Sequence, residues 1–70
     1  MMRAKILVVD DEESLRYTFN SFLSDEGHEV STAENYDEAL EQITNNNFDL
    51  IFMDIQMPVP LSWKTVNTYG

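Results

Sequence analysis

Short apolar runs alternate along the chain with longer segments in which apolar residues recur at helical spacing. Strands are expected over residues 5–9 and about 49–53, because each contains a fully apolar four-residue run bounded by polar residues. A weaker strand, polar on one side, is expected at roughly residues 29–33. These three strands are separated by two segments long enough to hold a helix each.

Both intervening segments carry helix start and stop signals. The first expected helix follows Asp11 and ends at Gly27, a typical residue just past a helix C-terminus. The second begins after Asn35, a favourable N-cap, with Glu38 placed as its capping-box partner, and ends at residues 45–47, three asparagines. The expected apolar face of the first helix is Leu15, Phe19, Phe22 and Leu23. That of the second is Tyr36, Ala39, Leu40 and Ile43.

The order strand-helix-strand-helix-strand predicts an α/β fold with a parallel sheet. The first and third strands are apolar on both faces and are expected to be central, whereas the second is mixed and is expected at an edge. These features predict the spatial strand order 2-1-3. Right-handed crossovers then run in opposite directions across the sheet and place the two helices on opposite faces.

Three aspartates follow the two most apolar strands: Asp10 and Asp11 after the first, and Asp54 after the third. Neighbouring parallel strands end at the same edge of a sheet, so the three carboxylates are expected to meet there. Such a group needs a shared proton or a divalent cation, and an all-oxygen site suits Mg²⁺ or Mn²⁺. Aspartate can also accept a phosphoryl group. The alternative is that Asp10 or Asp11 caps the following helix and Asp54 is an ordinary loop acid.

The charge distribution restricts the choice of partner. Thirteen acids and four bases give a formal net charge of −9, and every acid lies within residues 10–54. This argues against binding to nucleic acid or to an anionic membrane surface. The chain has no cysteine, no apolar run long enough to span a membrane and no recognisable signal segment, so a cytoplasmic protein is expected.

Two sequence segments closely resemble the receiver domain of bacterial two-component response regulators. They are Lys-Ile-Leu-Val-Val-Asp-Asp-Glu (5–12) and Asp-Leu-Ile-Phe-Met-Asp-Ile-Gln-Met-Pro (49–58). Residues 27–30 and 33–40 between them are also similar to the family. The resemblance covers residues 4–58 and implies a truncated flavodoxin-like βαβαβ fold. It divides the chain into a partial receiver domain, residues 1–58, and an atypical tail, residues 59–70.

The resemblance also implies a role for each site residue. Asp54 would be the phosphoacceptor, taking a phosphoryl group stoichiometrically from a histidine kinase rather than acting as an enzyme. Asp11 and Asp54 would bind Mg²⁺ (or Mn²⁺) through their side chains, and the backbone carbonyl of Gln56 would be a third ligand. Asp10 would hold the metal through water, and residues 57–58 would shape the loop after the phosphoacceptor.

The chain departs from the family pattern after residue 58. Receiver domains have about five strands, a hydroxyl residue after the fourth and a lysine after the fifth, whereas Lys64 and Thr65 stand here in a different context. Self-phosphorylation and dephosphorylation are therefore expected to be impaired. The third strand would be an apolar edge that pairs with other chains. A homodimer, or coverage by the tail, is expected to complete the sheet.

The sequence leaves three other functions open. A truncated or engineered half-domain that self-associates without signalling is favoured by the unusual tail. A phosphatase with an aspartate nucleophile would want a second acid where Gln56 stands. Flavin binding at the same edge of the sheet is disfavoured by the acidic loop at residues 10–13, which would repel a flavin phosphate.

Overall fold

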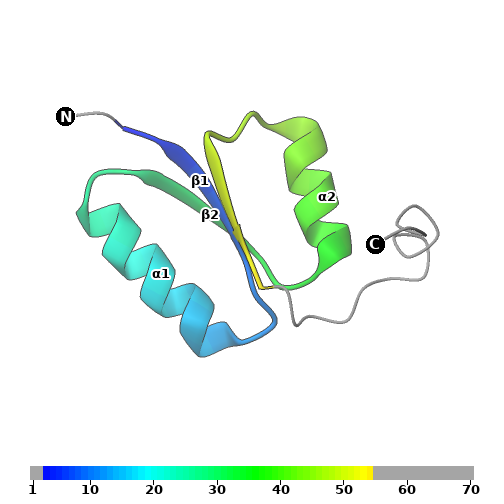
Figure 1. The fold of residues 1–70 in the computed structure, drawn as a ribbon, viewed down its shortest axis with the longest axis horizontal. Helices are drawn as coiled ribbons and strands as arrows, with labels where there is room; N and C mark the ends of the chain where they lie inside the picture. The colour runs from blue at the N-terminus through cyan, green and yellow to red at the C-terminus, as the bar shows by residue number, and fades with distance from the viewer. Residues whose placement is uncertain (1–2, 55–70) are drawn as a thin grey trace.

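The computed structural model describes residues 3–54, which form one parallel sheet and two helices (Figure 1). The elements in chain order are β1 (Lys5–Val9), α1 (Glu13–Asp25), β2 (Glu29–Ala33), α2 (Tyr36–Asn45) and β3 (Leu50–Met53). Both β2 and β3 pair with β1 in parallel, which gives the strand order β2-β1-β3. The predicted α/β class, strand order and element order are confirmed.

The two helices cover opposite faces of the sheet, as the crossover argument predicted (Figure 1). Side chains alternate between the faces along each strand. On the α2 face, the core cluster consists of Leu7, Val9, Ala33, Tyr36 and Ala39. On the α1 face, the ring of Phe52 stacks on that of Phe19 with centroids 5.8 Å apart. The sheet is therefore the layer on which both helices depend.

Burial falls sharply from the centre of the sheet to its β3 edge. The four apolar residues of β1 are at most 2% exposed. By contrast, Leu50, Ile51 and Phe52 of β3 keep 48%, 39% and 38% of their surface exposed. Within residues 3–54, β1 is therefore the central strand, as predicted. The prediction that the third strand is also central does not hold there, because β3 pairs with β1 on one side and lies at the edge of the sheet. Helix α1 likewise buries none of its residues completely.

The C-terminus of α1 is closed by backbone hydrogen bonds around a glycine. Gly27 has φ of +94°. Residues with a Cβ atom are strained in this conformation, whereas glycine adopts it readily. The amide of His28 donates to the carbonyl of Leu23 at 3.2 Å, and the amide of Gly27 donates to that of Ser24 at 3.0 Å. This is the Schellman pattern, and it confirms the predicted stop.

The N-terminus of α2 also follows the prediction, with one difference. The side-chain oxygen of Asn35 accepts from the amide of Glu38 at 2.8 Å, so Asn35 is the N-cap. The carboxylate of Glu38 reaches back, but it accepts from the amide of Glu34 at 3.1 Å, one residue before the expected partner. The cap therefore satisfies two amides and holds the turn between β2 and α2.

Several predictions concern residues beyond Asp54, which the structure does not describe. They include the backbone role of Gln56, the loop at residues 57–58, the boundary at residue 58 and the tail at 59–70. These stay predictions. Within residues 3–54, neither helix is long and apolar enough to cross a membrane.

Candidate metal centre

The site is built at the carboxyl ends of β1 and β3. Val9 pairs with Met53 at the last rung between these strands. The amide of Asp54 then donates to the carbonyl of Val9 at 3.0 Å, and the amide of Asp10 donates to that of Ala33 at 3.1 Å. These bonds extend the ladder by one residue on each side of β1, so the first acid after each apolar run starts from a rigid backbone.

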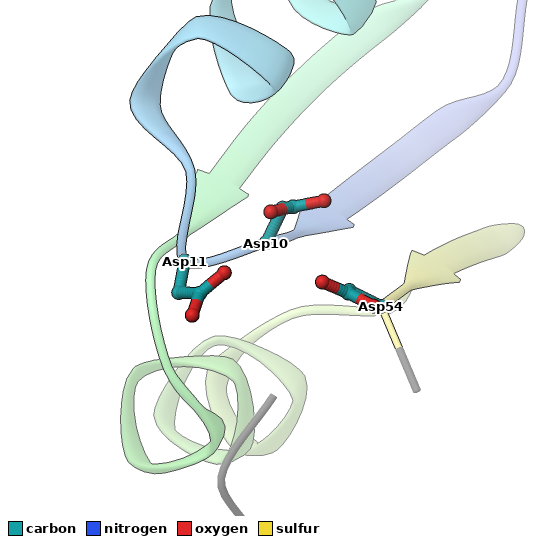
Figure 2. A group of neighbouring side chains, drawn as sticks. All are labelled: Asp10, Asp11 and Asp54. Carbon is teal, nitrogen blue, oxygen red and sulfur yellow. The ribbon is translucent and has the colours of Figure 1, made fainter. Parts of the chain in front are cut away.

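The structure brings together the three acids that the sequence placed at neighbouring strand ends. One carboxylate oxygen from each of Asp10, Asp11 and Asp54 lies within 4.8 Å of the other two. Figure 2 shows Asp54 approaching from the end of β3, with Asp10 and Asp11 following β1. Asp10 is buried, at 8% exposure, Asp54 is half-buried and Asp11 is exposed. The cluster thus opens to solvent on the side of Asp11.

Mutual repulsion makes this arrangement costly without a counterion. Two unit charges at about this separation repel by roughly 1 kcal/mol in water and about 3 kcal/mol near a protein surface. The ion pairs among residues 3–54 are Arg3–Glu29 at 3.4 Å and Lys5–Glu29 at 3.9 Å, at the opposite end of β1. A set of carboxylate oxygens open to water on one side suits Mg²⁺, which keeps several waters and takes one or two carboxylates.

Asp10 has a local structural role as well as its place in the cluster. Its Oδ1 atom accepts from the amide of Glu12 at 2.9 Å, which closes a turn between β1 and α1. Glu12 is the N-cap of α1 and makes no side-chain capping bond of its own. The alternative that Asp10 or Asp11 caps the following helix is wrong, because the N-cap is Glu12 and Asp10 binds the amide of Glu12 itself, before the first turn of α1. One of its oxygens holds the turn, while the residue still contributes to the acidic group.

Two further residues touch the backbone of the site, and the sequence predicted neither contact. The Nη1 atom of Arg16 donates to the carbonyl of Asp10 at 2.8 Å. The hydroxyl of Tyr36 donates to the carbonyl of Asp54 at 3.5 Å. Arg16 lies one turn beyond the N-cap of α1, and Tyr36 was assigned only to an apolar helix face. Neither position carries a motif that could have revealed the contact.

An apolar cleft of about 430 Å³ adjoins the carboxylates. The three aspartates and Glu12 line one part of it, and residues of β1, α1 and β3 line the rest. The apolar members are Val8, Val9, Leu15, Phe19, Phe52 and Met53. A low-dielectric wall on one side strengthens the attraction of the carboxylates for a cation.

The model of the response regulator receiver domain matches residues 6–61 of this sequence. The chain belongs to that family. It is 44% identical to the transcriptional regulatory protein ResD of Bacillus subtilis over 54 residues, which is 77% of this chain and 22% of ResD. The resemblance stated from the two aspartate segments is therefore confirmed. Membership leaves the phosphatase and flavin hypotheses without support.

Solved structures agree with the receiver assignment. The chemotaxis response regulator CheY4 of Vibrio cholerae matches with a TM-score of 0.81 and 40% identity, covering 93% of this chain and 54% of CheY4. The response regulator TrrA of Thermotoga maritima, solved in complex with Mg²⁺-BeF, matches with a TM-score of 0.74 and 47% identity, covering 81% of this chain and 49% of TrrA. The chain thus spans about half of each of these two receivers and about a fifth of ResD.

The family assignment gives the acidic group a chemical context. Receiver domains are generally phosphoacceptors rather than classical enzymes, they take phosphoryl groups from histidine kinases, and they use Mg²⁺. The three carboxylates of this receiver sequence are compatible with such a metal.

Replacing one acid of the cluster is expected to stabilise the protein when divalent cations are removed. Asp11→Asn takes away one of the repelling charges and should raise the free energy of unfolding by about 0.5 to 1 kcal/mol at low salt. Urea denaturation in EDTA measures this. Glu41→Gln, which removes an exposed charge from α2 away from the site, is the control and should change stability little. An Asp11→Asn variant no more stable than this control would contradict the repulsion.

Proposed function

We propose that the chain is a phosphoacceptor module of a two-component system, in which Asp54 takes a phosphoryl group from a histidine kinase with the help of Mg²⁺. One observation carries the proposal: in a chain of the receiver family, carboxylates from β1 and β3 lie within 4.8 Å of one another. This activity is a proposal because the chain spans about half of the two solved receivers and about a fifth of ResD.

The residues divide the work according to their positions. Asp54 is half-buried at the end of β3, where one carboxylate oxygen can reach an incoming phosphorus atom. Asp11 and Asp54 would hold the metal through their side chains, with Gln56 adding its backbone carbonyl from outside the described part of the chain. Asp10, buried and already bound to the amide of Glu12, would act through water. Mn²⁺ has the same preference for oxygen ligands.

The transfer itself conserves atoms and charge. A new bond forms between an oxygen of Asp54 and phosphorus while the phosphorus–nitrogen bond of the kinase phosphohistidine breaks, and the imidazole takes up a proton. The product is an acyl phosphate. A bound Mg²⁺ would offset the negative charge on the phosphoryl oxygens. Residues 3–54 would position the Asp54 carboxylate and supply the negative charge that holds the metal. Positioning and charge stabilisation are the main requirements of phosphoryl transfer.

Other expectations from the sequence stay predictions within this proposal. The net charge of −9 supports the prediction that the chain does not bind nucleic acid directly. The cytoplasmic location and the impaired self-phosphorylation and dephosphorylation belong to the same set of predictions.

A second candidate function is self-association through β3. Within residues 3–54 this strand has a neighbour on one side, and three of its four apolar residues, Leu50, Ile51 and Phe52, stay about two-fifths to one-half exposed. An apolar strand edge can pair with another chain. The charge of −9 on each copy opposes such pairing, so the dimer should tighten as salt is added.

Phosphorylation is tested by incubating the protein with acetyl phosphate and Mg²⁺ and recording its intact mass. A single base-labile phosphoryl adduct is expected to form slowly, because self-phosphorylation is expected to be impaired, and Asp54→Asn should abolish it because no other described acid occupies its place in the cluster. Asp49→Asn is the matched control: it lies at the other end of β3, where an asparagine oxygen can still accept from the amide of Lys5. An adduct that persists in Asp54→Asn, or a folded wild type that binds Mg²⁺ without forming one, would refute the assignment.

Self-association is tested by sedimentation at micromolar concentration. A dimer is expected, and Leu50→Lys should dissociate it by placing a charge on the strand edge. Leu40→Lys, on α2 and 49% exposed against 48% for Leu50, controls for the added charge and should leave the dimer intact. A folded monomer for the wild type would rule out this second candidate.

A further inference from the structure

Asp10 is held by protein hydrogen bonds on three sides. Its amide donates to Ala33, its Oδ1 atom accepts from Glu12, and its carbonyl accepts from the guanidinium of Arg16 at 2.8 Å. The first two bonds belong to the sheet and to a local turn. The bond from Arg16 is different, because its donor is a charged side chain on α1 and its acceptor is a neutral backbone oxygen.

We propose that Arg16 is a positioning residue of the acidic site, which fixes the peptide group between Asp10 and Asp11 and so directs the Asp11 carboxylate toward Asp54. This inference rests on the proposed function, because it names what sets the geometry of the same metal centre.

Peptide planarity links the observed bond to Asp11. The carbonyl oxygen of Asp10 and the nitrogen and Cα atoms of Asp11 lie in one plane, so a restraint on that oxygen fixes where the Asp11 side chain begins. Asp11 is exposed, and its carboxylate makes no hydrogen bond or ion pair within residues 3–54. Its position therefore depends chiefly on its backbone, and Arg16 holds that backbone.

Charge alone predicts the opposite effect. Arg3 and Lys5 pair with Glu29 at the far end of β1, so Arg16 is the arginine or lysine nearest the carboxylates among residues 3–54. If its charge were all that mattered, removing Arg16 would lessen repulsion of an incoming cation and tighten metal binding. If positioning matters more, removing it loosens the ligand set and weakens binding. The sign of the change separates the two effects.

The test measures Mn²⁺ binding by electron paramagnetic resonance at fixed ionic strength. Arg16→Gln should weaken binding on the order of tenfold, the lower range for losing an outer-shell partner of a metal ligand. Arg3→Gln changes the net charge equally at the other end of β1 and should leave affinity unchanged or slightly higher. Arg16→Lys keeps the charge but loses the planar fork of donors, and should fall between wild type and Arg16→Gln. Binding by Arg16→Gln that equals or exceeds that of Arg3→Gln would overturn the inference.

A metal-free readout keeps this inference separable from the proposed function. In NMR relaxation, the amide order parameters of Asp11 and Glu12 should fall in Arg16→Gln from the rigid level of about 0.85 toward the flexible range below about 0.6. They should not change in Arg3→Gln. Unchanged order parameters in Arg16→Gln would refute the positioning role even if the metal site is real. A wild type that binds no Mn²⁺ would instead refute the metal centre itself, and if Arg16→Gln fails to fold, Arg16→Lys supplies both measurements.

Discussion

The parallel pairing of β1 with β3 is the constraint on which the site depends. It places two strand ends side by side, and ladder bonds from the amides of Asp10 and Asp54 fix where the acids that follow the strands begin. A shift of the register by one residue would turn every side chain of β3 to the other face of the sheet. Asp54 would then point away from Asp10 and Asp11. The carboxylates are held together by a backbone arrangement that makes no use of their charge.

The burial of β1 opposes the repulsion at the site. Its four apolar residues are almost fully buried between the helices, and fully burying a side chain of this size contributes about 1.5 to 3 kcal/mol. Three pairs of charges, each repelling by about 1 to 3 kcal/mol, oppose folding by roughly 3 to 10 kcal/mol, which is of the same order as this burial. The burial of β1 therefore offsets the repulsion, and a cation that lowers the repulsion would stabilise the fold. Hydrogen bonds to the backbone of Asp10 and Asp54 hold the cluster further in place.

Local signals explain what could be predicted from the sequence. The apolar run before Asp10, the glycine at position 27 and the N-cap at Asn35 act through the nearest residues, and the structure has all three where expected. The meeting of Asp11 with Asp54 needed one further step, the parallel strand order 2-1-3, which puts the carboxyl ends of the first and third strands side by side.

The contacts that the sequence did not reveal depend on how elements pack. The bond from Arg16 to the carbonyl of Asp10 requires the angle at which α1 leaves the loop, and no spacing rule encodes that angle. The exposure of Phe22 on α1 and of Leu50 on β3 depends on what lies beside them, so their apolar character alone could not separate buried from open positions. Glu38 took the amide of Glu34 because capping side chains are long enough to reach either of two neighbouring amides.

The central claim is that acids from two different strands form one divalent-cation site. Isothermal titration of Mg²⁺ into wild type, Asp11→Asn, Asp54→Asn and the double variant tests it as a thermodynamic cycle. If one ion is shared, wild type binds a single Mg²⁺, each single variant binds it weakly, and the second substitution adds little to the loss of the first. Losses that simply add, or an affinity unchanged by Asp11→Asn, would contradict a shared site.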